Sequence, residues 1–282
     1  LFASPAVLLG PSATRLAHAP LQKLQDELRS AASEGLGVIL HVPSTMPRWA
    51  LELHPGLGVS EGQHSIDYDI DHPAAAGLMA AFFRVLLPHL TERAPSAPSA
   101  PSSPSTPAPA PPAPRACHPA ILGLQLANEP ALRGTSSVHT RASFATWLRG
   151  EYNSSLAELR ANWGEGEGGD DGEAAGPAVA ALTSFEAAAA LGAPPPPGPG
   201  HRAIAEPPPG SSMAARVSDW FRFNDFRFAR WQLRLATAIW RASPCYATLA
   251  KLNQAFTIDE RLADNGVDAA SMVAGHNISA YD

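Results

Sequence analysis

The sequence lacks the long apolar runs and the basic clusters that would tie it to a membrane or to nucleic acid. No stretch of its 282 residues reaches the roughly 18 consecutive apolar residues needed to cross a bilayer, and no basic region precedes the apolar N-terminus. Lysine and arginine never cluster beyond a pair, and the formal net charge is -6. We therefore expect neither nucleic acid nor an anionic membrane as a partner.

Cysteine is also scarce, since the chain has only Cys117 and Cys245. The two lack the CxxC spacing of zinc or redox sites, and the histidines and aspartates show no metal-ligand spacing. We expect no metal and no other cofactor. The cysteines could form a disulfide or remain as two buried thiols, and we predict thiols. They do not fix the compartment of a chain that we expect to be soluble, whether secreted or organellar.

Proline and glycine are plentiful but bunched: the 29 prolines and 22 glycines gather in two zones. Residues 94–115 are almost wholly Pro, Ala and Ser, and residues 164–212 combine acidic Gly-rich, Ala-rich and Pro-rich stretches. Such segments cannot bury enough apolar surface to offset their ordering entropy, so we predict two disordered insertions in one domain, 1–282. Residues 182–186 are predicted to be a small ordered island in the second.

Outside these zones, amphipathic helical patterns alternate with short apolar runs that are stopped by proline or glycine. The helical patterns cover 21–33, 73–93 with an interruption at Pro88, 144–163 with a break at Asn153-Ser154, and 217–241. The apolar runs cover 36–42, 121–130, 245–253 and the tip 278–282. Alternation of helices with strands buried on both faces predicts a parallel α/β fold.

The run 121–130 ends in an Asn-Glu pair, Asn128-Glu129, and Pro130 stops it. Parallel α/β barrels keep their chemistry at the carboxyl ends of the strands. A carboxyl group on an apolar strand, beside an amide, can have its pKa raised enough to act as a general acid. The alternative is a solvated glutamate at a strand end.

The segment that follows the strand at 36–42 carries His41, Trp49, Tyr68 and Asp69. Aromatic faces stack on sugar C–H surfaces, while carboxylates and imidazoles bind hydroxyl groups, so this composition suits a sugar. In the alternative interpretation, Trp49 plugs the loop against the core and His41 is a core histidine.

Arginines alternate with aromatic residues along the helical pattern 217–241. This alternation could suit single-stranded nucleic acid. In an acidic chain, we favour a core-facing helix with Arg–carboxylate pairs on its flanks.

Four segments, in order, resemble the catalytic barrel of the family 42 β-galactosidase type in clan A of the glycoside hydrolases. They are Gly35–His41 with Pro47-Arg48-Trp49-Ala50 and His54-Pro55, then Pro119–Pro130, then Phe144–Gly164 with its Trp147, Tyr152, Leu159 and Trp163, and lastly Asp219–Pro244. The resemblance covers about half of the chain. It implies a partial (β/α)8 TIM barrel of the α/β class, a fragment that holds about strands three to six.

The resemblance also implies a retaining glycosidase for β-linked sugars, β-galactosidase-like, with a carbohydrate substrate. Glu129 would be the general acid/base and Asn128 would bind the sugar's 2-hydroxyl. His41, Trp49, Tyr68, Asp69, Asn253 and Tyr281 would line the subsites. The family's nucleophile has no counterpart here and is expected beyond the C-terminus, so we expect the fragment alone to be inactive. The cysteine-rich metal cluster of many members is absent.

Three alternatives stay open from the sequence. The barrel could be a catalytically inactive carbohydrate-binding module, or a clan relative that acts on β-mannan or β-glucan. The chain could also be an interaction protein that works through residues 94–115, although this tract lacks the basic flanks of a recognition ligand. The oligomeric state is undetermined.

Overall fold

The computed structural model of the protein describes residues 3, 5–10, 15–41, 45–58, 68–93, 115–126, 137–164, 175–192, 212–243, 245 and 248–249. All structural statements below refer to these residues.

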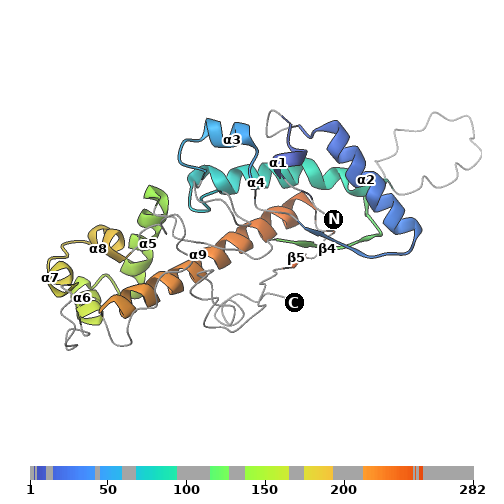
Figure 1. The fold of residues 1–282 in the computed structure, drawn as a ribbon. Coiled ribbons are helices and arrows are strands. Elements are labelled where there is room, and N and C mark those ends of the chain that lie inside the picture. The colour runs from blue at the N-terminus through green and yellow to red at the C-terminus, as the bar shows by residue number, and fades with distance from the viewer. Residues whose placement is uncertain are drawn as a thin grey trace, which may run out of the picture.

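Three of the described strands form a small parallel sheet, which lies against the helices on one side (Figure 1). Its strands are β1 (Val38–His41), β4 (Ile121–Gln125) and β5 (Thr248–Leu249), in the order β1-β4-β5. In this register His41 lies beside Gln125, which lies beside Leu249. The predicted strands at 36–42 and 121–130 are therefore confirmed in shorter form, and their carboxyl ends meet in one row.

Three helices cover one face of the sheet: α2 (His18–Ser33), α4 (Pro73–Leu86) and α9 (Ser212–Ala242). Gly35 ends α2 with a positive φ of 69°, a conformation that glycine adopts without strain. The helix α4 passes at Pro88 into a 3-10 turn, η1 (Leu87–His89), because proline cannot continue the backbone ladder. Two short helices, α1 (Pro5–Leu8) and α3 (Arg48–Leu53), lie beside these. The buried residues between these elements include Leu28, Leu40, Met79, Phe82, Phe83, Leu124, Phe228 and Ile239.

The other face of the sheet is open in the described part of the chain. Ile39 is 43% exposed and Leu122 is 65% exposed, and both alternate with the buried Leu40 and Leu124. The predicted burial on both faces is therefore wrong for the described residues, because helices pack against one side only.

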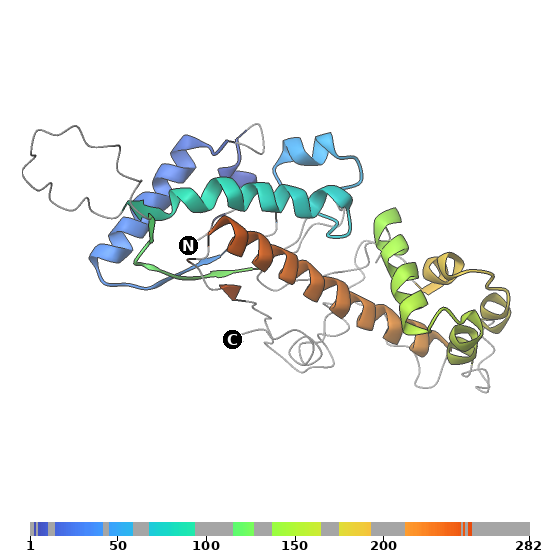
Figure 2. The ribbon, with the colours of Figure 1, turned by 180° about the vertical axis from the view of Figure 1, so that it is seen from behind.

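A second helical unit follows β4 in the chain (Figure 2). It contains α5 (Val138–Glu151), α6 (Leu156–Gly164), α7 (Ala175–Ala180) and α8 (Phe185–Gly192). Asn153 and Ser154 separate α5 from α6 with positive φ values of 48° and 64°, at the predicted break. The order around 182–186 extends over two helices and so exceeds the predicted island. The rest of 164–212 lies outside the described residues.

The helix α9 joins the two units. It runs unbroken for 31 residues, which corresponds to about 46 Å. Its first half contributes Trp220 and Phe223 to the core of the helical unit, and its second half contributes Trp231 and Leu235 to the core beside the sheet. This confirms the prediction of a core-facing helix. Within the described ranges, no helix combines the length and the apolar character that a bilayer requires.

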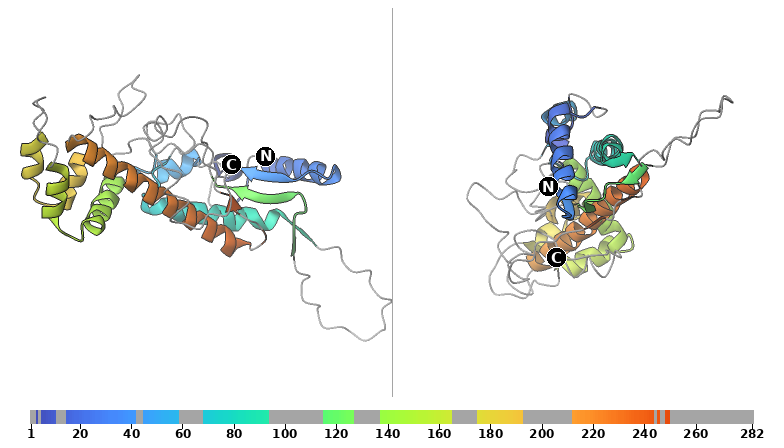
Figure 3. Two further views of the ribbon diagram at one scale, coloured as in Figure 1. Left: turned by 90° about the horizontal axis from the view of Figure 1, so that it is seen from below. Right: turned by 90° about the vertical axis from the view of Figure 1, so that its right-hand side faces the viewer.

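The segment 94–114 lies outside the described residues, and the two short strands that flank it pair with one another (Figure 3). Strand β2 (Thr91–Arg93) pairs antiparallel with β3 (Arg115–Cys117), so that Arg93 lies beside Arg115. The sequence analysis did not predict this ladder. It lies at the amino ends of the strands, the end opposite the row of His41 and Gln125.

Cys117 and Cys245 form a disulfide with a Cα–Cα distance of 5.3 Å. The prediction of two thiols is wrong. Cys117 precedes β4 and Cys245 precedes β5, and the two strands are parallel neighbours. Neighbouring parallel strands begin at the same sheet edge, which brings the two cysteines together.

Candidate functional site

The candidate site lies at the carboxyl ends of β1, β4 and β5, where the chain leaves the sheet after His41, Gln125 and Leu249. Asn128 and Glu129 follow Gln125 by three and four residues and lie outside the described residues. The structure resumes at Ser137, the N-cap of α5. The segment that carries Glu129 is thus held at both ends, by the sheet before it and by α5 after it.

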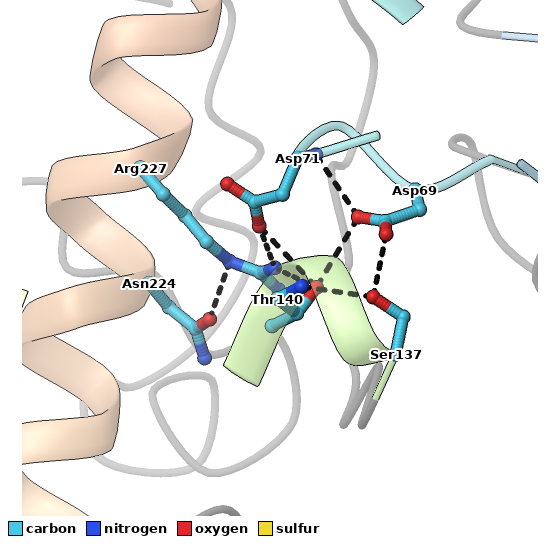
Figure 4. Close-up of polar contacts among 6 residues, drawn as sticks. All are labelled: Asp69, Asp71, Ser137, Thr140, Asn224 and Arg227. Carbon is cyan, nitrogen blue, oxygen red and sulfur yellow. Dashed lines mark hydrogen bonds and ion pairs between the residues drawn. The ribbon is translucent and has the colours of Figure 1, made fainter. Parts of the chain in front are cut away.

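A polar network holds Ser137 and the start of α5 in place (Figure 4). The hydroxyl of Ser137 accepts a hydrogen bond from the Thr140 backbone N–H at 2.9 Å and donates to Asp69 Oδ2 at 2.5 Å. Thr140 Oγ1 lies 3.2 Å from Asp69 Oδ1, which also accepts from the Asp71 backbone N–H at 2.9 Å. The start of α5 is therefore bound to the loop that leads into α4.

Arg227 of α9 closes the network. Its Nη1 donates to Asp71 Oδ2 at 2.7 Å and to Thr140 Oγ1 at 3.0 Å, and its Nε donates to Asn224 Oδ1 at 2.8 Å. The guanidinium carbon also lies 5.3 Å from the centroid of the Phe223 ring. The Arg227 side chain is only 3% exposed and that of Asp71 is 12% exposed. The ion pair is therefore shielded from water, and its charges attract each other more strongly than an exposed pair would. The network connects α9 with the start of α5 and with the loop that leads into α4.

Four of the predicted site residues are described. His41 ends β1 and is half-buried, and its carbonyl accepts from the Ala3 N–H at 2.8 Å. Trp49 lies in α3, half-buried against the core beside the sheet. Tyr68 and Asp69 are each 1% exposed. The Tyr68 ring meets Trp231 edge-on at 5.6 Å, and the Asp69 carboxylate is engaged in the network described above.

Tyr68 and Asp69 are therefore buried rather than on an open surface. The sugar contacts predicted for the four residues stay predictions. Asn253 and Tyr281 lie outside the described residues, as do Asn128 and Glu129.

Three histidines meet at the start of α4. His72 caps the helix, since its Nδ1 accepts the Ala74 N–H at 3.1 Å. Its ring lies 4.6 Å from that of His139 and 6.1 Å from that of His54, centroid to centroid. Burial, followed by the neighbouring His139, lowers the pKa of His72 below its usual value. The neutral imidazole is thus the form that caps α4.

A second buried carboxylate, Asp219 of α9, belongs to the helical unit. It accepts from Trp163 Nε1 at 2.8 Å and from the hydroxyl of Tyr152. Burial and this hydrogen bond raise the pKa of Tyr152. No group of three or more His, Cys, Asp and Glu side chains among the described residues could hold a metal ion.

The sequence analysis did not single out most of the network. Ser137 stands directly before a helical pattern, which is an N-cap signal that could have been used. The pairing of Arg227 with Asp71 joins positions 156 residues apart. The predicted Arg–carboxylate pairs do form, as Arg222–Glu151 and Arg227–Asp71, but no local pattern indicates which carboxylate belongs to which arginine.

No protein-family model matches the chain, and no curated protein matches it. Solved structures do match. An apo exo-carrageenase of glycoside hydrolase family 42 from Bacteroides ovatus matches with a TM-score of 0.62 and 18% identity, over 100% of this chain and 32% of that one. A cold-adapted β-galactosidase from Rahnella sp. R3 gives 0.57 and 16%, over 100% and 34%. A polyextremophilic β-galactosidase from the Antarctic haloarchaeon Halorubrum lacusprofundi gives 0.57 and 15%, over 99% and 35%.

The fold of the chain is thus similar to part of these TIM-barrel structures. It spans about a third of the length of these structures. At such low identities, the likeness establishes the fold, and the activity has to be argued from the residues.

Proposed function

We propose that this chain is part of a retaining glycoside hydrolase that cleaves β-linked sugars, with β-galactosides as the substrate class. The observation that carries the proposal is the parallel pairing of β1 with β4, which end together at His41 and Gln125. The Asn128-Glu129 pair follows at the carboxyl end of β4. In TIM-barrel enzymes this end of the strands carries the catalytic groups.

The surroundings of this segment suit a catalytic loop. Catalysis needs groups held close to their working positions, and loops achieve this when their ends are fixed by rigid elements. Before the segment, Leu126 is buried at 3% exposure. After it, Ser137 is held by Asp69 and Thr140, and Arg227 holds Asp71 and Thr140 in turn.

Each residue has a specific proposed role. Glu129 protonates the glycosidic oxygen in the first step and then deprotonates the attacking water in the second. Asn128 binds the 2-hydroxyl of the sugar. The nucleophile is a second carboxylate about 5 to 5.5 Å from Glu129, and we do not assign it to a residue of this chain.

The test uses the full polypeptide that contains this chain, with the variant Glu129→Gln. The wild type is expected to hydrolyse aryl β-galactosides with retention of configuration. Removal of a general acid costs about 10²- to 10⁴-fold in rate. This loss should appear in full with a poor leaving group and be much smaller, in the first step, with an activated aryl galactoside. Added azide needs no general base, so it should restore turnover of the activated substrate by the variant.

Glu52→Gln is the matched control, because Glu52 is an exposed glutamate on α3 that pairs with Arg48. Its rates should equal those of the wild type. Equal losses on both substrates, or no rescue by azide, would argue against the acid/base role of Glu129. A full polypeptide that binds galactosides without hydrolysing them would identify a carbohydrate-binding barrel instead.

A further inference from the structure

A basic groove runs along the outer side of the helical layer, between α4 and α9. It has a volume of about 740 Å³, and four arginines line it: Arg84, Arg230, Arg234 and Arg241. All four side chains are exposed. Among the described residues, the lining contains no aspartate, glutamate or lysine. In a chain with a net charge of -6, this groove concentrates positive charge on one surface.

The three arginines of α9 form a single stripe. Their spacing of four and seven residues places them within about 40° of one another around the helix and extends them over about 16 Å along it. Arg84 stands on α4, which packs beside α9. Among the described residues, none of these four arginines has a carboxylate partner, whereas Arg48, Arg149, Arg222 and Arg227 do. The stripe is therefore available to an external anion.

The lining of the groove argues against two classes of partner. Among the described residues it is mostly small, with Ala76, Gly77, Ala80 and Ala238 beside two larger apolar side chains, Leu233 and Leu235, so it offers few contacts to the bulky anchor residues of an acidic helix. No aromatic side chain of the described part of the chain lines the groove, and single-stranded nucleic acids rely on such side chains for stacking. The groove does offer a row of arginine side chains. Each guanidinium group can donate two hydrogen bonds to the oxygens of one sulfate or carboxylate group. The hydroxyl of Thr237 lies among these arginines.

We propose that this groove binds an anionic glycan, through the sulfate or carboxylate groups of several sugar units. The inference rests on the proposed function in one respect, because a glycoside hydrolase is expected to meet a polysaccharide. The groove is lined by α4 and α9 and not by the carboxyl ends of the strands, so it is a binding surface separate from the site proposed for cleavage.

The experiment measures binding of the full polypeptide to dextran sulfate, to neutral dextran of the same length, and to polygalacturonate. The test variant is Arg230→Gln/Arg234→Gln. The control is Arg29→Gln/Arg48→Gln, which removes the same charge from exposed arginines of α2 and α3 outside the groove. We expect tight binding of an anionic glycan only, and binding about tenfold weaker in the groove variant, as two exposed charge contacts would supply. The control should bind as the wild type does, and 1 M salt should abolish binding.

Preference for sulfate over carboxylate, or the reverse, would identify the anionic group and support the proposal. Equal losses in the groove and control variants would overturn it, because they would reveal an unspecific effect of charge. Equal affinity for poly-glutamate or single-stranded DNA would overturn it in favour of another partner. Glu129→Gln leaves the groove intact, which separates the two proposals. Binding without hydrolysis refutes the glycosidase alone, and hydrolysis without binding refutes the groove alone.

Discussion

Arg227→Met removes the charge that joins α9 to Asp71 and Thr140 and keeps most of the volume of the side chain. Because Arg227 is 3% and Asp71 12% exposed, the variant leaves a carboxylate in a dry site without its cation. Breaking a buried pair from one side costs about 3 to 5 kcal/mol. For a domain of this size, that loss lowers the Tm by roughly 10 °C.

The assay is denaturant unfolding of wild type, Arg227→Met, Asp71→Asn and the double variant. We expect the double variant to be more stable than the sum of the single losses predicts, with a coupling energy of about 1 to 3 kcal/mol. Arg48→Met is the matched control, since its pair with Glu52 has side chains 91% and 63% exposed, and such pairs contribute at most about 1 kcal/mol. If Arg227→Met lowers the free energy of unfolding no more than the control does, the network does not hold α9, α5 and the loop before α4 together.

Two further predictions follow from the structure. The Cys117–Cys245 disulfide spans 128 residues. Reduction of the bond, or the double variant Cys117→Ser/Cys245→Ser, should therefore lower the free energy of unfolding by about 5 kcal/mol. A thiol titration that finds two free thiols in the untreated protein would contradict the bond. The pKa of His72 is lowered in the folded state, so the unfolded chain binds the proton more readily than the folded protein does. The contribution of His72 to the free energy of unfolding is therefore complete above its unfolded pKa of about 6.5, and it is lost as the pH falls through the folded pKa. Unfolding at pH 8 and pH 5 should therefore show a loss in the wild type that is smaller in His72→Asn, whose side chain can still cap α4; equal losses in both proteins would refute this role of His72.

Local patterns in the sequence predict the elements of the fold well. Gly35 and the apolar spacing before it predict the end of α2, and the run that Pro43 stops predicts β1. The helices on either side of Asn153 also form where their patterns indicate. These features depend on neighbours in the chain, which is why the sequence reveals them.

Contacts between distant segments were not predictable in the same way. The disulfide requires knowing that β4 and β5 are neighbours, and the β2–β3 ladder requires knowing that Arg93 and Arg115 meet. The buried state of Asp69 depends on Ser137 and Thr140, which arrive from 68 and 71 residues away. The role of Glu129 stays a prediction, since it rests on the Asn-Glu pair and on the place of β4 in the sheet.

The β2–β3 ladder has a consequence for how the gene can change. It fixes Arg93 and Arg115 side by side, so a change in the length of the segment between them leaves the two ends of that segment at the same separation. The entropy of closing a loop rises slowly with its length, by about 0.6 kcal/mol for each doubling. Replication slippage in a repetitive Pro-Ala-Ser tract could therefore lengthen or shorten it across generations at little cost to folding. We therefore expect a foreign peptide inserted between Arg93 and Arg115 to leave the stability of the fold nearly unchanged.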